Sequence, residues 1–336
     1  MQIGLIGYGA WGSHHAAAIV ETAGLELTAV CSSSEESRQS AAEKYRVPVF
    51  SGYRELLASP DVGAVDIVLP THLHREVAGA AFESGKHVLL EKPMALTPEE
   101  CTELISLARR AGRILYVGHE LRHSPQWGGM RRLIEDGRIG QPLYATIDLW
   151  RRPYRFGSGN WRYDARRVGS WILEEPIHFF DLAAWWMRRA GWPESVFARG
   201  SKLAASPEGL WDNLSAVLSF QGGAHATVTQ TLAACEHHLS AKVVGEHGAL
   251  LAFWDGEMDR TTHPLCSLKL ARDGRLEDIP IDPTGEYHEL RAQMAHLAAV
   301  ARGECKPIIT PEEAALAVSV CWAAERSARS GLPENI

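Results

Sequence analysis

The sequence has no long apolar run and no charged tail. No apolar stretch reaches the roughly 20 residues that a membrane-spanning helix needs, and the first residues enter a strand pattern without the segments of a secretion signal. The formal net charge of −7 is spread along the chain, with neither a basic run typical of nucleic-acid binding nor an acidic tail. We therefore expect a cytoplasmic protein whose partner is a small molecule, with no nucleic acid and no membrane.

Paired cysteines and metal-binding motifs are also missing. The six cysteines are scattered without CxxC spacing, at Cys31, Cys101, Cys235, Cys266, Cys305 and Cys321. This pattern argues against a zinc site and against a disulfide framework. The pairs His14-His15 and His237-His238 lack a third ligand at metal spacing. We predict reduced cysteines and no metal.

The first dozen residues contain the strongest motif. The apolar run Gln2-Ile3-Gly4-Leu5-Ile6 leads into Gly7-Tyr8-Gly9-Ala10-Trp11-Gly12, and residues 14–21 have a helical pattern. In a strand, glycine turn and helix of this kind, Gly7 allows the sharp turn and Gly9 lets a pyrophosphate approach the backbone. Gly12 lets the helix pack close to the strand. The motif predicts a dinucleotide site that includes Gly7, Gly9, Ala10, Trp11 and Gly12.

The second strand, 25–31, ends at Ser32-Ser33-Ser34, where the adenosine ribose is expected. NAD enzymes commonly place a carboxylate there, which holds the 2′-hydroxyl and repels the extra phosphate of NADP. Ser32 and Ser33 can bind either group, and Arg38 can approach a phosphate, although the neighbouring glutamates weaken the positive potential. The serines are equally consistent with a cap on the helix that starts near Glu35. The choice between NAD and NADP stays open.

Strands and helices continue to alternate as far as residue 118. Strands are expected at 64–69, 87–90 and 113–118, with helices at 53–58, at 75–84 and after the capping box of Thr97 and Glu100. This alternation predicts a doubly wound parallel sheet, in which ligands bind at the carboxyl ends of the strands. The cofactor contacts expected at those ends are Leu69, Pro70, Thr71, His74, Glu91, Lys92 and His119.

The pattern changes in the second part of the chain. From about residue 143 it favours antiparallel strands, with a hairpin at 213–229 and strands at 241–244 and 265–271. Helices are expected at 125–136, 177–189, 286–302 and 310–330. We predict a dinucleotide-binding domain over residues 1–120 and a second, α+β domain over residues 121–336, whose final helix, 310–330, is able to pack back on the first domain.

Three motifs in the right order identify a resemblance: the glycine turn, Glu91-Lys92-Pro93, and Glu174-Glu175-Pro176-Ile177-His178-Phe179-Phe180-Asp181. Two shorter segments, Val117-Gly118-His119 and Trp161-Arg162-Tyr163-Asp164, lie between the second motif and the third. Together they resemble the glucose–fructose oxidoreductase / inositol 2-dehydrogenase / rhizopine-catabolism (Gfo/Idh/MocA) family over nearly the whole length. The resemblance implies a Rossmann domain, a C-terminal domain with an open, mainly antiparallel sheet, and a homodimer or homotetramer. It also implies the oxidation or reduction of a secondary alcohol of a sugar, sugar acid or cyclitol.

The resemblance also implies roles for individual residues. His178 becomes the general base that takes the hydroxyl proton, and Lys92 stabilises the negative charge that develops on the substrate oxygen. Glu174 stands where the family usually has Asp; it can reach the substrate or orient the histidine, a role that Glu175 can share. Asp181 matches a family position but also suits the first turn of a helix.

Arginines and aromatic residues crowd together between residues 151 and 167. Guanidinium groups bind anions in a bidentate manner, and aromatic faces stack on sugars, so an anionic sugar is one interpretation. An oligomer interface or a clasp on the cofactor pyrophosphate is the other. The predicted substrate contacts are Lys92, Arg122, Arg152, Tyr154, Trp161, Glu174 and His178, with Trp161 and Arg162 also expected at the cofactor.

Three functions fit these motifs. The first is an NAD(P)-dependent sugar or cyclitol dehydrogenase. The second is an oxidoreductive glycoside hydrolase, in which NAD oxidises a ring hydroxyl, the aglycone is eliminated and the hydride returns. The third is a non-catalytic, cofactor-binding sensor, against which the presence of both Lys92 and His178 argues.

Overall fold

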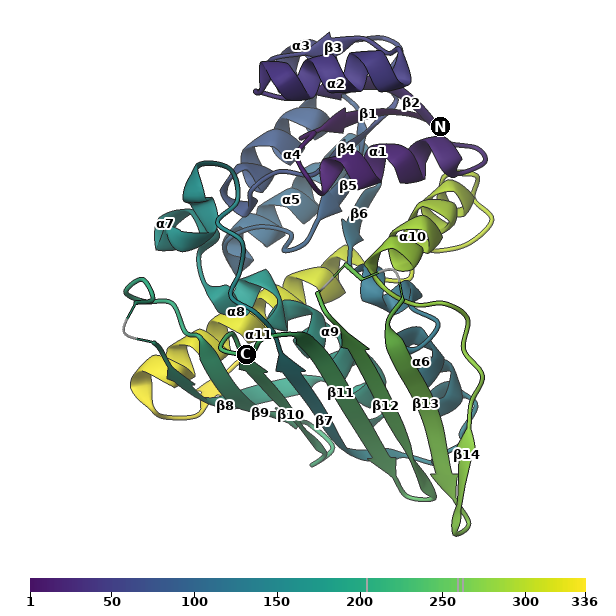
Figure 1. Cartoon of the computed structure of the whole chain (residues 1–336), viewed down its shortest axis with the longest axis vertical. Coiled ribbons are helices and arrows are strands. Elements are labelled where there is room, and N and C mark those ends of the chain that lie inside the picture. The colour runs from purple at the N-terminus through teal and green to yellow at the C-terminus, as the bar shows by residue number, and fades with distance from the viewer. Residues whose placement is uncertain (204, 259, 262) are drawn as a thin grey trace. The chain divides into compact units, whose positions relative to one another are not determined.

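The computed structural model describes residues 1–203, 205–258, 260–261 and 263–336. The chain divides into two compact units. The first contains residues 1–120 and 290–316, and the second contains residues 121–289 and 317–336; Figure 1 shows the elements of each. Among the described helices, none combines the length and the apolar character that crossing a lipid bilayer requires.

The first unit is built on a six-stranded sheet in the order β3-β2-β1-β4-β5-β6, in which every pairing is parallel. Its strands are β1 (Gln2–Ile6), β2 (Glu26–Cys31), β3 (Val49–Phe50), β4 (Ala64–Ile67), β5 (His87–Glu91) and β6 (Leu115–Gly118). The order reverses between β1 and β4, which is the point where ligands bind in open α/β sheets. The prediction of a doubly wound parallel sheet is confirmed.

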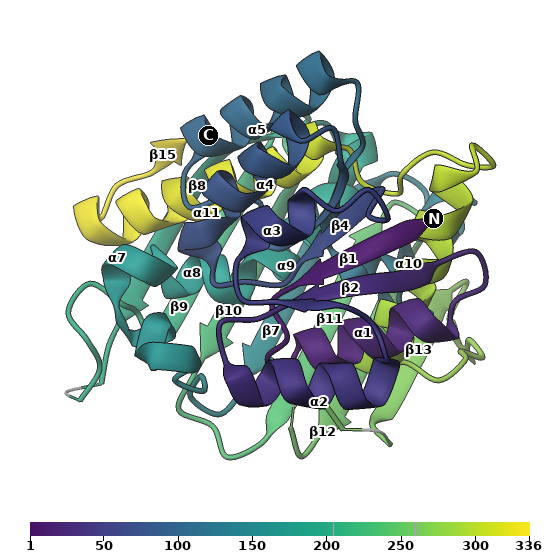
Figure 2. The ribbon, with the colours of Figure 1, turned by 90° about the horizontal axis from the view of Figure 1, so that it is seen from above.

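Helices cover both faces of this sheet. They are α1 (Gly12–Glu21), α2 (Glu35–Tyr45), α3 (Tyr53–Leu57), α4 (His74–Glu83) and α5 (Pro98–Ala111). Figure 2 shows α1 and α2 on one side and α3, α4 and α5 on the other. The predicted capping box is present at α5, where Thr97 Oγ1 accepts from the Glu100 amide and Glu100 Oε2 accepts from the Leu96 amide.

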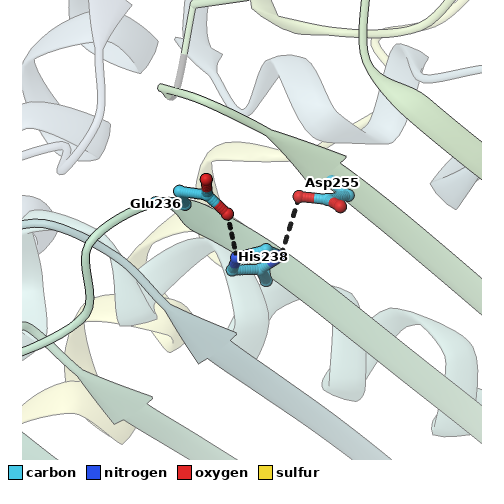
Figure 3. A group of neighbouring side chains, drawn as sticks. All are labelled: Glu236, His238 and Asp255. Carbon is cyan, nitrogen blue, oxygen red and sulfur yellow. Dashed lines mark ion pairs between the residues drawn. The ribbon is translucent and has the colours of Figure 1, made fainter.

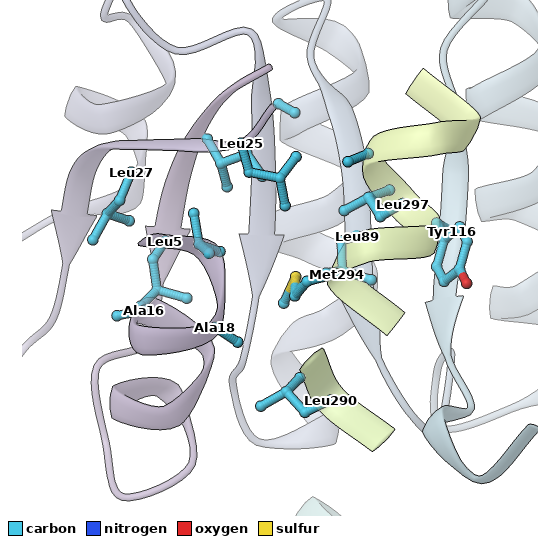
Figure 4. Packing of buried hydrophobic residues seen from close by; sticks show 14 of the residues in the cluster. Leu5, Ala16, Ala18, Leu25, Leu27, Leu89, Tyr116, Leu290, Met294 and Leu297 are labelled. Carbon is cyan, nitrogen blue, oxygen red and sulfur yellow. The ribbon is translucent and has the colours of Figure 1, made fainter. Parts of the chain in front are cut away.

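The helix α10 (Glu286–Ala301) belongs largely to the first unit rather than to a continuous second domain. Its apolar residues Leu290, Met294 and Leu297 pack into one core with residues of α1 and of the parallel strands (Figure 4). The last helix, α11 (Pro311–Ser330), starts in the first unit and ends in the second. The chain therefore crosses between the units three times, which sequence patterns alone do not reveal.

The second unit is built on a nine-stranded sheet in the order β14-β13-β12-β11-β7-β10-β9-β8-β15. Among the described strand pairs of this sheet, only β7–β10 is parallel; a long connection with several helices and the strands β8 and β9 separates the two in the sequence. The strands are β7 (Pro142–Trp150), β8 (Pro193–Ser201), β9 (Asn213–Phe220), β10 (His225–Thr231), β11 (His237–Gly245), β12 (Gly248–Gly256), β13 (Leu265–Arg272), β14 (Arg275–Asp278) and β15 (Glu334–Asn335). The predicted α+β class with a mainly antiparallel sheet is confirmed.

Most helices of this unit lie between β7 and β8. They are η3 (Ser158–Tyr163), α7 (Ala165–Val168), α8 (Trp171–Glu174), α9 (Pro176–Trp186) and η4 (Met187–Ala190). The unit also contains α6 (Trp127–Glu135) and the end of α11. Helix α9 packs on β7 and β10 and is buried along most of its length. The helix predicted at 177–189 is thus shorter, because its last turn tightens into η4.

Candidate functional site

The parallel sheet brings most of the predicted cofactor contacts of the first unit to one edge. All six strands run in the same direction, so their carboxyl ends meet there. Five strands end next to predicted contacts: Gly7 follows β1, Ser32 follows β2, Leu69 follows β4, Lys92 follows β5 and His119 follows β6. Two of the predicted cofactor residues, Trp161 and Arg162, belong to the second unit instead.

The three glycines of the turn are present for different structural reasons. A Cβ on Gly7, whose φ is +105°, would lie 2.1 Å from the Val68 carbonyl oxygen, and a Cβ on Gly12 would lie 1.9 Å from the Gly7 carbonyl oxygen. The fold itself therefore demands these two glycines. A Cβ on Gly9 would meet no described atom within 4 Å. Packing does not explain this glycine, whereas close approach of a pyrophosphate to the backbone does, so the turn fits a dinucleotide.

The serine segment after β2 carries both a cap and a cation. Ser34 caps α2 by accepting from the Ser37 amide at 3.2 Å, as one of the two interpretations of this segment expects. Arg38 Nη1 donates to the carbonyl oxygens of Ser32 and Ser33 at 2.8 and 3.0 Å. A guanidinium is therefore held at the end of β2.

A buried ionic triad lies beneath this edge and escaped the sequence analysis. His15 Nδ1 is 2.8 Å from Asp66 Oδ2, and His15 Nε2 is 3.3 Å from Glu91 Oε1. Burial lowers the pKa of His15, but Asp66 and Glu91 outweigh it and raise the pKa to about 10. Burial raises the pKa of Glu91, but His15, Lys92 and His74 together hold it below the usual value. The signal in the sequence was Asp66, a charge inside an otherwise apolar strand.

His74 connects two strand ends. Its Nδ1 is 2.8 Å from the Pro93 carbonyl oxygen, and its Nε2 is 2.8 Å from the Leu69 carbonyl oxygen. The Lys92–Pro93 peptide bond is cis. The ring that we expected to contact the cofactor therefore ties the end of β4 to the segment that carries Lys92.

In the second unit, His178 lies in the first turn of α9, after Pro176 at the first helical position. The side chain is buried, with 5% of the residue exposed. Each carboxylate within four residues of His178 in the sequence has an arginine partner: Glu174 pairs with Arg162, Glu175 with Arg151, and Asp181 with Arg122.

Several predicted substrate contacts take part in packing. Arg122 is buried and donates to Asp181 from Nε at 2.9 Å and from Nη2 at 2.7 Å. Tyr154 and Trp161 belong to an apolar cluster with Trp171, and the Tyr154 hydroxyl donates to Gln230 Oε1 at 3.0 Å. The arginine that we expected to contact the substrate is committed to a buried carboxylate.

The arginine-rich segment is largely neutralised by its own surroundings. Arg151, Arg162 and Arg166 pair with Glu175, Glu174 and Asp164. Arg152 and Arg167 each donate to a backbone carbonyl, of Cys235 and Gly159 respectively. These partners weaken the case for an anionic sugar that rests on the number of arginines.

One group of described side chains has a composition that could hold a metal ion (Figure 3). His238 Nε2 is 3.1 Å from Glu236 Oε2, and Nδ1 is 2.7 Å from Asp255 Oδ1. One ligand atom of each of the three residues lies within 4.8 Å of the other two, and in this structure the two carboxylates form ion pairs with opposite ring nitrogens. The adjacent His237 points to the other face of the sheet, where it is buried near Glu175.

Two models of one family match the chain. The model of the oxidoreductase family with the NAD-binding Rossmann fold matches residues 1–119, and the GFO/IDH/MocA C-terminal domain matches residues 128–251. The chain belongs to the Gfo/Idh/MocA oxidoreductase family. This confirms the resemblance and identifies the protein as an oxidoreductase with an NAD-binding fold.

Similar members of the family are known by sequence and by structure. The chain is 28% identical to 1,5-anhydro-D-fructose reductase of Ensifer adhaerens, over 95% of this chain and 93% of the relative. It is 25% identical to scyllo-inositol 2-dehydrogenase (NAD⁺) of Bacillus subtilis, over 100% and 96%. The structure of aldose-aldose oxidoreductase from Caulobacter crescentus, complexed with glycerol, has a TM-score of 0.87 at 22% identity, over 100% of this chain and 99% of that chain. That last similarity establishes the fold alone.

Proposed function

We propose that this oxidoreductase is an NAD(P)-dependent dehydrogenase that acts on a secondary alcohol of a sugar, sugar acid or cyclitol. The observation that carries the proposal is the position of Lys92, which follows β5 at the same sheet edge as the glycine turn after β1. The names of the reductase and dehydrogenase relatives agree with this substrate class. When bound, the nicotinamide accepts or donates the hydride.

Lys92 would act on the substrate oxygen. An ammonium group is a compact cation with three donors, so it stabilises negative charge as the hydroxyl loses its proton. Glu91 is anchored through its side chain, and the Pro93 carbonyl oxygen is anchored by His74. The backbone on both sides of Lys92 is therefore held in place, which a positioned catalytic group requires.

His178 would accept the hydroxyl proton in the oxidation and return it in the reduction. A general base must be neutral before it accepts a proton. The carboxylates nearest to His178 in the sequence, Glu174, Glu175 and Asp181, each form an ion pair with an arginine. We propose that Glu174, fixed by Arg162, orients the substrate or the imidazole.

We further propose that the protein accepts both NAD and NADP. No carboxylate stands at Ser32 to repel a 2′-phosphate, and Arg38 is held at the end of β2 by two carbonyl oxygens. A guanidinium in this position can pair with the phosphate of NADP. The neutral serines leave the ribose hydroxyls of NAD with hydrogen-bonding partners.

A second copy of the chain is the proposed protein partner. One face of the nine-stranded sheet carries apolar side chains that are exposed in the single chain, among them the cross-strand neighbours Phe197 and Val217. Exposed apolar patches of this kind typically mark an interface. Sedimentation of the parent and of Phe197→Asp tests this, because a dimer or tetramer should dissociate when the charge is introduced.

A panel of sugars, sugar acids and cyclitols, scored by absorbance of reduced nicotinamide with each cofactor, tests the activity. We expect reduced cofactor to accumulate in proportion to turnover with at least one cyclic polyol. Release of an aglycone from a glycoside without net reduced cofactor would instead support the glycoside hydrolase. Cofactor binding without turnover on the whole panel would contradict the dehydrogenase and favour a sensor.

A further inference from the structure

The His15, Asp66 and Glu91 side chains form a buried ionic triad to which the proposed chemistry gives no part. His15 lies on α1 three residues after Gly12, Asp66 lies inside β4, and Glu91 is the last residue of β5. His15 and Asp66 have no exposed surface, and 7% of Glu91 is exposed. The triad thus joins the cofactor-turn helix to the strand end that precedes Lys92.

Stability alone does not explain three ionisable groups in this position. Removing charges from water costs several kcal/mol for each ion, and apolar side chains of similar volume often stabilise such a site better. One oxygen of the group, Asp66 Oδ1, is buried without a hydrogen-bond partner among the described residues. The desolvation of this oxygen is therefore not offset by a hydrogen bond among the described residues, which indicates a role of the triad beyond packing.

The triad fixes the Glu91 carboxylate from two sides. His15 Nε2 faces Glu91 Oε1 at 3.3 Å, and a Cβ built on Gly118, the neighbour of Glu91 across β6, would lie 2.9 Å from the same oxygen. The carboxylate therefore fills the space above Gly118. Since Glu91 is held there, the chain direction at Lys92 is set from the strand side, while His74 holds the Pro93 carbonyl from the other side.

We infer that His15 is a positioning residue for Lys92, acting as a cation between Asp66 and Glu91 that holds the end of β5 in place. This inference rests on the role proposed for Lys92. The positive ring also favours the ionised form of the buried Glu91, because Nδ1 is hydrogen-bonded to Asp66 Oδ2 while Nε2 forms an ion pair with Glu91 Oε1 at 3.3 Å. Without that charge, Glu91 is free to take up a proton or to turn away, and the Lys92 ammonium loses its fixed direction.

A double-mutant cycle on kcat tests the inference. We expect His15→Gln to lower kcat at least tenfold while the Kd of the cofactor changes less than threefold. In a Lys92→Ala background, the same substitution should lower kcat less than twofold further, because a residue that acts through Lys92 has nothing left to position. The matched control is His87→Gln, which replaces a neutral, half-buried histidine at the opposite end of β5 and should leave kcat within twofold of the parent.

The protonation of His15 provides a readout independent of activity. Imidazole ¹⁵N–¹H spectra of the parent at pH 8 should contain a pair of ring N–H signals that His15→Gln removes and that Asp66→Asn shifts or weakens. Asp66→Asn also serves for the kinetics if His15→Gln does not fold. Additive losses in the cycle, or a neutral His15 at pH 8, would overturn the inference. Unchanged turnover of Lys92→Ala would instead refute the proposed function itself.

Discussion

Glu289 should make the stability of the second unit depend on pH in an unusual direction. This carboxyl group is buried at the start of α10, where its Oε1 accepts from the Thr284 hydroxyl at 2.8 Å and from the Gly285 amide at 3.2 Å. Burial raises its pKa from 4.5 to about 7, although the hydrogen bonds from Thr284 and Ser124 oppose the shift. Between about pH 4.5 and pH 7, the folded protein therefore holds a proton on Glu289 that the unfolded chain has already lost.

The magnitude follows from the shift. A carboxyl group whose pKa is raised in the folded state does not lower the free energy of unfolding below pH 4.5, because the group is protonated in both the folded and the unfolded state. As the pH rises to about 7, its contribution to the free energy of unfolding falls, by about 3 kcal/mol at about 1.4 kcal/mol per pH unit. Above pH 7 the loss is complete and constant.

Glu289→Gln keeps the shape and one acceptor oxygen but cannot ionise. We expect the variant to match the parent near pH 4.5 and to be more stable by up to about 3 kcal/mol at pH 8. Urea unfolding followed by tryptophan fluorescence reports on the correct unit, because ten of the eleven tryptophans lie in the second unit. Glu277→Gln, an exposed substitution of the same charge, is the control. A stability difference between parent and Glu289→Gln that stays constant from pH 4.5 to pH 8 would refute this reasoning.

Three further predictions follow from single contacts. Gly9→Val should weaken cofactor binding at least about a hundredfold, because the branched side chain would occupy the space of the pyrophosphate. The unfolding of the second unit should not change, because a Cβ on Gly9 has no described atom within 4 Å. Parental affinity of the folded variant in titration calorimetry would make this glycine only structural. Ser32→Asp should raise the NAD/NADP ratio of kcat/KM at least about tenfold, or about 1.4 kcal/mol, because the new carboxylate repels the 2′-phosphate of NADP. An unchanged ratio in steady-state kinetics would mean that Ser32 does not face the ribose. Arg122→Met should destabilise the second unit by about 3–5 kcal/mol, because the buried Asp181 carboxylate loses its guanidinium partner. Adding Asp181→Leu should restore most of that loss in urea unfolding, and no recovery in the double variant would show that the pair itself stabilises the fold.

The sequence predicts the parts of the fold that follow from local patterns. Alternating apolar strands and capped helices identify the parallel sheet, and the Thr97 capping box forms as expected. The sequence does not predict the strand β12 or the packing of α10 in the core of the first unit. Both depend on which apolar faces meet in three dimensions. The triad escapes prediction for the same reason, since 51 residues separate His15 from Asp66. The burial of Arg122 and Tyr154 and their protein partners are likewise not evident from residue type, and their contact with a substrate stays a prediction.

The most direct test of the proposed chemistry measures cofactor binding and hydride transfer separately in Lys92→Ala and His178→Ala. Single-turnover absorbance at saturating cofactor, with the cyclic polyol found in the panel, gives the rate of hydride transfer, and calorimetry gives the Kd of the cofactor. We expect each variant to bind the cofactor within about threefold of the parent and to transfer hydride on the order of a hundredfold more slowly. Hydride transfer at the parental rate in either variant would contradict the role proposed for the replaced residue.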